Sequence, residues 1–214
     1  MKTIRSNVFE TNSSSCHAIT FSHNAVCNHT GVLRMFAENS YSGEGILDTP
    51  EEKADYFSVA LATYLRAKYI NKHFEFWNGR ISDSSSIKEE LGDACGDSYL
   101  QKFPLIPSIA RELISEAKRL MDEIQAEFKS HGVEVSFSEG NYGFIVAEDR
   151  KITRSMRVQD IYDLISFQGD IDHSSSPEED PDCDAANLAK LAYNPEFLYE
   201  FIFNDSTIDC KFFG

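Results

Sequence analysis

The chain has 214 residues, of which 42% are hydrophobic and 26% charged, the proportions of a folded globular protein. Its 35 acidic residues outnumber its 20 Lys and Arg, which gives a formal net charge of −15 at pH 7. This balance argues against direct binding to nucleic acid or to anionic membranes, and it suits a partner with a basic surface.

The cysteines and the apolar stretches predict where the protein works. The five cysteines are odd in number and lack the spacing of a disulfide framework. Residues 1–15 contain no apolar leader, and no window approaches the length of a membrane span. We therefore expect a cytoplasmic protein that neither crosses nor binds a membrane.

The N-terminal region predicts two short strands around a polar turn. Lys2–Arg5 and His17–Phe21 have the alternation of strands, and Asn7–Ser15 between them is rich in turn-forming residues.

A first long helix is predicted over Thr49–His73. Thr49 and Glu52 have the spacing of a capping box, and Pro50 stands at the first helical position. Asn78-Gly79 then predicts a turn. Trp77, the only tryptophan, is expected in the core with Phe74 and Phe76.

The strongest helical pattern covers Ser108–His131 and is followed by Gly132 as a C-terminal cap. Val133–Phe137 then alternates as a strand. Residues 139–141 form a predicted turn, after which Tyr142–Ala147 returns as the partner strand of a hairpin.

The C-terminal part mixes short helices with an acidic loop. Val158–Phe167 predicts a helix, and Asp170–Asp184 a solvated loop that contains no Lys or Arg and lacks the pattern of an EF-hand. Ala185–Tyr193 is helical in pattern. Phe197–Phe213 fits either a final hairpin or a short helix followed by a strand.

The order of these elements predicts an α+β fold, in which one or two long helices pack across an antiparallel sheet. We expect a single globular domain over residues 1–214, with the acidic loop at 170–184 as an excursion from it.

Chemically, the densest polar segment is Asn12-Ser13-Ser14-Ser15-Cys16-His17. Consecutive hydroxyls that end at a histidine can cradle a phosphate or place a nucleophile beside a general base. Taken alone, the segment is better explained as a polar turn whose hydroxyls bond to their own backbone.

A resemblance changes that balance. Residues 5–17, RSNVFETNSSSCH, resemble the N-terminal segment of a group of uncharacterised bacteriophage and mobile-element proteins, mainly of Gram-positive hosts. That group carries V-F-E-T-N-S-S-S-x-H after a short strand, often with Thr where Cys16 stands here. The resemblance covers about residues 1–21, and it implies a phage or mobile-element origin and a bacterial host cell, but no particular reaction.

With the resemblance, we expect a pocket at this segment. Its catalytic candidates are Ser13, Ser14, Ser15 and His17, with Arg5, Glu10 and Asn12 as ligand-binding residues and Arg5 as the anion clamp.

A weaker alternative is a structural zinc ion held by Cys16, His23, Cys27 and His29, since zinc takes Cys and His ligands. No CxxC pair accompanies these residues. Our expectation is therefore that the protein uses no cofactor.

Three functions follow. The first is a phage accessory protein, for host takeover or against host defence, that binds and blocks a host protein with a basic surface. The second is a small enzyme that cleaves or modifies a nucleotide or RNA through the NSSSCH segment. The third is a structural phage protein.

Overall fold

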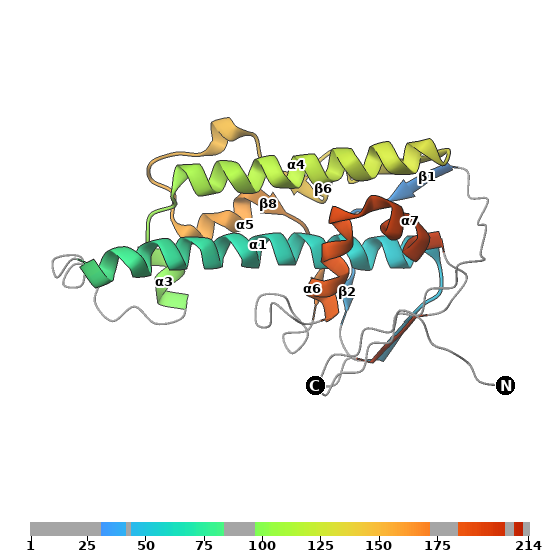
Figure 1. Cartoon of the computed structure of the whole chain (residues 1–214), viewed down its shortest axis with the longest axis horizontal. Coiled ribbons are helices and arrows are strands. Elements are labelled where there is room, and N and C mark those ends of the chain that lie inside the picture. The colour runs from blue at the N-terminus through green and yellow to red at the C-terminus, as the bar shows by residue number, and fades with distance from the viewer. Residues whose placement is uncertain (1–30, 42–43, 84–96, 172–183, 204–207, 212–214) are drawn as a thin grey trace.

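The computed structural model describes residues 31–41, 44–83, 97–171, 184–203 and 208–211 (Figure 1). The α-helices are α1 (Pro50–Asp83), α3 (Asp97–Lys102), α4 (Pro107–Ser130), α5 (Ile161–Leu164), α6 (Asp184–Ala189) and α7 (Pro195–Phe203). Short 3-10 helices are η1 (Asp149–Lys151), η2 (Val158–Asp160) and η4 (Lys190–Tyr193). The strands are β1 (Gly31–Arg34), β2 (Ser40–Tyr41), β3 (Glu44–Leu47), β4 (Val133–Ser136), β5 (Ser138–Glu139), β6 (Tyr142–Gly143), β7 (Ile145–Val146), β8 (Ile165–Ser166), β9 (Asp170–Ile171) and β10 (Ile208–Lys211).

Helix α1 is the central element, and the predicted capping box begins it. The Glu52 carboxylate accepts the Thr49 amide at 3.0 Å, and the Thr49 hydroxyl accepts the Glu52 amide at 3.2 Å. From Lys53 to Thr63 every side chain is buried, so this half of the helix is enclosed on all sides rather than on one stripe. The other elements pack around it.

The C-terminal end of α1 differs from the prediction. The helix continues through Asn78-Gly79 to Asp83, so the predicted turn is wrong. Trp77 explains the extension, because its ring packs against Phe103 at 5.5 Å between centroids and its indole N–H donates to the Pro104 carbonyl at 3.2 Å. Phe76 also contacts Trp77, as expected, whereas Phe74 is 44% exposed.

Helix α4 matches its prediction within one residue at each end and runs antiparallel to α1 (Figure 1). Its apolar face supplies much of the core, through Ile109, Ala110, Leu113, Ile114, Ala117, Leu120, Ile124 and Phe128. Gly132 follows the helix with φ of +82°, the left-handed conformation that a glycine cap permits.

The strands form five two-stranded sheets within the described residues, not one antiparallel sheet crossed by helices. β4 pairs in parallel with β1, and β2 in parallel with β9. The pairs β3–β10, β5–β6 and β7–β8 are antiparallel. The α+β class is therefore correct, while the expected sheet is replaced by small pairs set around the helices.

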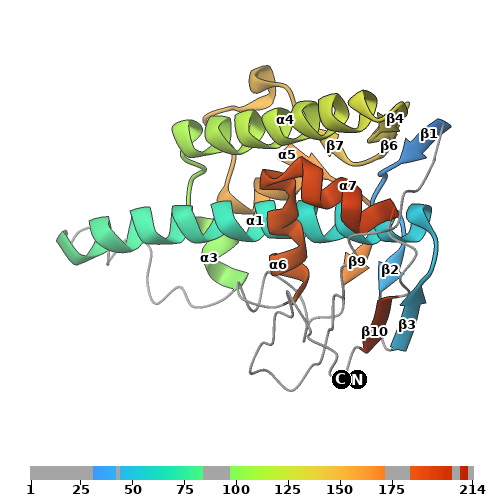
Figure 2. The same cartoon turned by 45° about the vertical axis from the view of Figure 1, so that its right-hand side comes forward.

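In the strand predictions, the turn at residues 139–141 is correct and the strand partner is not. The turn at residues 139–141 joins β5 to β6, but β4, expected in the same hairpin, pairs with β1 instead. Val158–Phe167 forms η2, α5 and then β8 in place of one helix. At the C-terminus α6, η4 and α7 lie beside α1 and α4 (Figure 2), and the tail takes the helix-then-strand alternative.

Candidate functional site

The predicted N-terminal site lies outside the described residues, so it stays a prediction. This applies to Arg5, Glu10, Asn12, Ser13, Ser14, Ser15 and His17, and to the zinc alternative of Cys16, His23, Cys27 and His29. Elsewhere, the part of the chain that is described contains no group of three side chains suited to a metal ion. It also contains no helix that could span a membrane.

A polar cluster between α1, α4 and η4 centres on the carboxylate of Glu116 on α4. It accepts hydrogen bonds from the Lys68 ammonium at 2.8 and 3.0 Å and from the Tyr69 hydroxyl at 2.6 Å, both on α1. A third donor, the Tyr193 hydroxyl of η4, lies at 2.5 Å. One half-buried carboxylate therefore joins three elements.

The ionisation of this cluster follows from its contacts. Burial opposes the charged form of Glu116, but hydrogen bonds from Lys68, Tyr193 and Tyr69 outweigh it and hold its pKa below the usual range. Burial and the neighbouring carboxylate raise the pKa of both tyrosines. Both hydroxyls therefore stay protonated as donors. The cluster fastens α1, α4 and η4 to one another, and the Glu116 oxygens are occupied by these internal donors.

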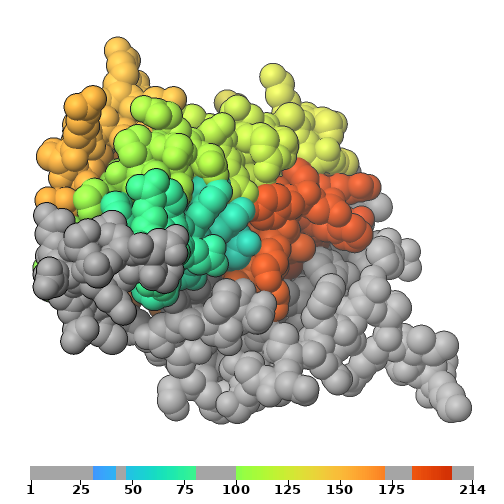
Figure 3. Space-filling view, turned by 60° about the vertical axis from the view of Figure 1, so that its left-hand side comes forward, coloured from blue at the N-terminus to red at the C-terminus, as the bar shows by residue number. Residues whose placement is uncertain are grey.

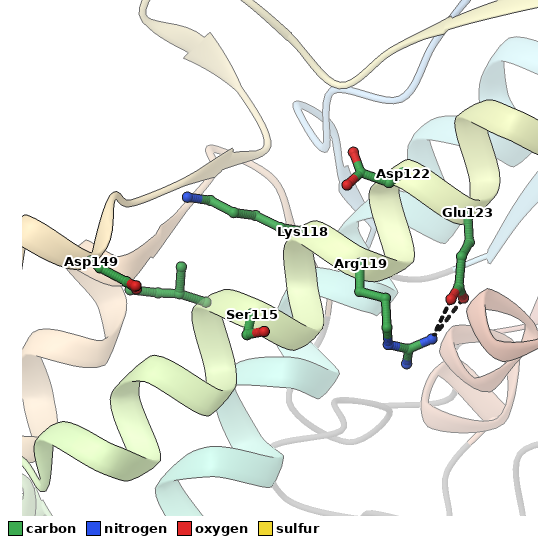
Figure 4. Close-up of a pocket in the computed structure, with 7 residues that line it drawn as sticks. Ser115, Lys118, Arg119, Asp122, Glu123 and Asp149 are labelled. Atoms are coloured by element: carbon green, nitrogen blue, oxygen red, sulfur yellow. Dashed lines mark hydrogen bonds and ion pairs between the residues drawn. The ribbon is translucent and has the colours of Figure 1, made fainter.

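Two shallow depressions lie beside the Glu116 cluster, on the outer face of α4. One, of about 340 Å³, is lined by Tyr69, Glu112, Ser115, Glu116 and Arg119. The other, of about 440 Å³, is lined by Ile114, Ser115, Lys118, Arg119, Asp122, Glu123 and Asp149 (Figure 4). Ser115 and Arg119 line both, so the two depressions adjoin.

Charges of both signs line the larger depression. Arg119 is held by Glu123, whose carboxylate oxygens both lie 2.7 Å from one guanidinium nitrogen. Lys118, Asp122 and Asp149 form no ion pair with any described residue, and Lys118 extends along the depression toward the side that carries Asp149 (Figure 4). Such open, charged walls suit contact with a macromolecule more than enclosure of a small molecule.

A second carboxylate, Asp55 of α1, organises the chain before and within β2. It accepts the Glu38 amide at 2.9 Å, the Asn39 amide at 3.2 Å and side chain at 2.9 Å, and the Tyr41 hydroxyl at 2.8 Å. Asp55 is only 8% exposed. These bonds satisfy its charge and fasten residues 38–41 to the start of the central helix.

The β2–β9 pair joins two stretches that are far apart in sequence. Ser40 pairs with Asp170 and Tyr41 with Ile171, and the Gly169 amide donates to the Ala37 carbonyl at 2.7 Å. Residues 35–52 and 167–189 together hold twelve Asp and Glu and no Lys or Arg. We call the exposed carboxylates that gather here the acidic surface: Glu38, Asp48, Glu51, Glu52 and Asp170.

Of the five carboxylates of the acidic surface, the predicted acidic loop contains only Asp170, and sequence reasoning found none of the Glu116 cluster. The acidic loop was visible as a run of carboxylates, but its neighbour at residues 35–52 has only scattered acids. Glu116 carries one usable signal, since it stands between the apolar positions Leu113 and Ala117 that α4 buries. A carboxylate beside an apolar stripe indicates a partner on another element.

Comparison of the chain with protein-family models, with curated proteins and with solved structures finds no match.

Proposed function

We propose that this chain is a binding protein that docks its acidic surface on a partner protein with a basic surface and blocks it. The single observation that carries the proposal is the β2–β9 pair, which sets Asp170, the first carboxylate of the second acidic stretch, beside Ser40 of the first. The resemblance of residues 5–17 supports a phage or mobile-element setting, in which the partner belongs to the host.

The acidic region is more concentrated than net charge alone requires. The two stretches hold twelve carboxylates and no Lys or Arg, and five of them are exposed on the described residues. Such a local negative charge steers a basic partner toward the surface and penalises acidic ones. The Asp55 bonds also hold residues 38–41 in place, so Glu38 is presented from a fixed backbone. A fixed surface loses less conformational entropy on binding than a flexible one.

The arrangement of the described carboxylates supports binding more than catalysis. Asp55 and Glu116 are the carboxylates with the most hydrogen bonds, and both use their acceptors on internal donors. Neither is placed as a general base for an external substrate. The carboxylates of the acidic surface lie in solvent, where they can act through charge.

The test is capture of partners from a lysate of candidate host bacteria, followed by titration of the captured protein. One variant, Glu38→Gln with Glu51→Gln and Asp170→Asn, removes three charges from the acidic surface. A control, Glu134→Gln with Glu196→Gln and Glu200→Gln, removes three exposed charges from other elements. Glu52 is left intact because it caps α1.

We expect one basic protein that is retained by the chain and by the control, is released by salt, and binds the surface variant at least tenfold more weakly. Equal retention by the surface variant contradicts the proposal. Loss of the partner with His17→Ala but not with the surface variant would instead favour the enzyme that the NSSSCH segment predicts.

A further inference from the structure

The chain carries a second charged region of opposite sign. Residues 66–80, 97–121 and 148–157 contain twelve of the twenty Lys and Arg and only six Asp and Glu. These stretches belong to the second half of α1, to α3 and α4, and to the segment around η1. Net charge alone conceals this separation of positive from negative charge.

The two regions lie toward opposite ends of α1, a helix of 34 residues and therefore about 50 Å long. The acidic surface surrounds its N-terminus, where β2 and β9 lie (Figure 2). The basic stretches surround its C-terminal half, where α3 and the start of α4 lie (Figures 1 and 2). A ligand at one end is therefore screened from the charge of the other at physiological ionic strength.

The segment 148–157 concentrates this positive charge and stands out from the helical body (Figures 1 and 3). It carries Arg150, Lys151, Arg154 and Arg157, all exposed. Arg150 pairs with Glu148 at 2.7 Å. The other three, like the nearby Lys118, form no ion pair with any described residue.

Backbone bonds hold the segment in place despite its exposure. Its C-terminal end pairs with the chain between α3 and α4, since the Leu105 amide donates to Met156 and the Val158 amide donates to Phe103, both at 2.9 Å. At the other end, the Lys151 amide donates to the Glu148 carbonyl. The cations therefore project from an ordered turn.

We propose that Lys118, Lys151, Arg154 and Arg157, the basic face, bind the phosphate backbone of double-stranded DNA. This reverses the expectation that net charge gives for nucleic acid, and it does not depend on the acidic surface having a partner. Arginine and lysine are the usual phosphate-binding residues. The exposed Ser115 hydroxyl, and one hydroxyl of the Thr153–Ser155 pair, whose hydroxyls bond to each other at 3.0 Å, are additional donors to phosphate oxygens.

The composition of the segment favours phosphate over an acidic protein. Protein interfaces are anchored by buried aromatic or large apolar side chains. Segment 148–157 contains no aromatic residue, and its two large apolar side chains, Ile152 and Met156, are half-buried. Contact with a phosphate backbone needs only the charges and hydroxyls that this segment exposes.

The same features favour duplex DNA over other nucleic acids. Single strands bind to aromatic side chains on which bases stack, and the segment has none. A projecting turn can enter the major groove of B-form DNA, about 12 Å wide, while the major groove of duplex RNA is too narrow for side chains to read.

The test measures binding of the full chain to a fluorescent 20-base-pair DNA duplex by anisotropy over a range of salt concentrations. Lys151→Glu with Arg154→Glu alters the basic face, and Lys151→Ala with Arg154→Ala is a milder version. Arg34→Glu with Lys129→Glu makes the same charge change on β1 and the end of α4. Thermal melting confirms that each variant is folded.

We expect micromolar or weaker binding by the wild type at low salt, as for sequence-independent contacts. The Lys151/Arg154 reversal should lower affinity at least tenfold and flatten the slope of log K against log salt by about two. The Arg34/Lys129 control should stay within about threefold of the wild type.

Three outcomes overturn the proposal. The first is no binding by the wild type at 50 mM salt, and the second is equal loss in the reversal and in its control. The third is equal or tighter binding to poly-glutamate, to single-stranded DNA or to duplex RNA, which would assign the basic face to that ligand class instead.

Discussion

Glu116 shows how one side chain can hold three elements together. Replacing it with Ala leaves the Lys68 ammonium and two tyrosine hydroxyls without their shared acceptor. We expect the free energy of unfolding to fall by about 2 kcal/mol in urea denaturation. The control Glu123→Ala breaks only an exposed pair with Arg119 and should cost less than about 0.5 kcal/mol. Equal losses would contradict the structural role of Glu116.

The same carboxylate gives a dependence of stability on acid. Its folded-state pKa lies below the value of about 4.3 in an unfolded chain. Its stabilisation is therefore present above about pH 4.3 and is lost as the pH falls through the folded-state pKa. Glu116→Gln should remove this part of the acid response. An unchanged curve for unfolding free energy against pH would refute the assignment.

His73 of α1 should act in a different pH window. Its side chain is fully buried, and its Nδ1–H donates to the Tyr69 carbonyl at 2.7 Å. Burial lowers its pKa, and the neighbouring Lys72 ammonium adds to the effect. The unfolded chain therefore binds the proton more readily, and stability falls as the pH drops below about 6.5.

Replacing His73 with Leu tests this account. The difference in unfolding free energy between wild type and variant should change between pH 7 and pH 5, with the wild type losing stability as acid is added and the variant losing less. The measurement is a series of urea denaturations across that range. Parallel curves would show that His73 does not titrate on unfolding.

At the scale of elements, Gly169 sets how closely β9 approaches α1. A Cβ atom there would meet the carbonyl oxygens of Asn39 at 2.6 Å and Ala37 at 2.8 Å, and a Val59 methyl at 2.6 Å. Gly169→Ala should therefore separate β2 from β9 and lower stability by about 1–3 kcal/mol. It should also weaken partner binding, because it disturbs the acidic surface.

Gly79 provides the matched control for Gly169. It lies inside α1, and a Cβ atom there has open space around it. Gly79→Ala should raise stability by about 0.5–1 kcal/mol, since alanine is the better helix former. Thermal melting of both variants tests whether Gly169→Ala lowers stability and Gly79→Ala raises it. A loss of stability in Gly79→Ala would contradict the extension of α1 beyond the predicted turn.

The sequence predicted helices better than it predicted strand partners. The capping box at Thr49 and the apolar periodicity of Ser108–His131 are local signals, and both helices begin where expected. The end of α1 was missed because it depends on Trp77 meeting Phe103, a contact that no neighbouring residue encodes. The parallel partners β1 and β4 are about 100 residues apart, and no local turn signal in the sequence predicts their pairing.

For the candidate sites too, local features could be predicted from the sequence and long-range contacts could not. The acidic loop was predicted from its composition, but the pairing of Asp170, at its start, with Ser40 is given only by the β2–β9 register. The Glu116 cluster draws donors from positions 68, 69 and 193, which only the folded chain brings together. The NSSSCH segment, from which the enzyme alternative arises, lies outside the described residues and stays a prediction.

At the scale of the whole molecule, the acidic surface and the basic stretches lie toward opposite ends of α1. A chain with net charge −15 would be expected to repel every polyanion, yet twelve of its twenty Lys and Arg lie in the three stretches around the C-terminal half of α1. We therefore expect the two proposed sites to act independently, so that variants of the acidic surface leave a ligand of the basic face bound, and the reverse.

The most direct measurement for the central claim is the dissociation constant of the captured partner at two salt concentrations. It is determined for the wild type, for Glu38→Gln with Glu51→Gln and Asp170→Asn, and for the control at Glu134, Glu196 and Glu200. The account predicts affinity that falls with salt and drops at least tenfold in the acidic-surface variant alone. Equal affinity in all three proteins, or binding that salt does not change, would contradict it.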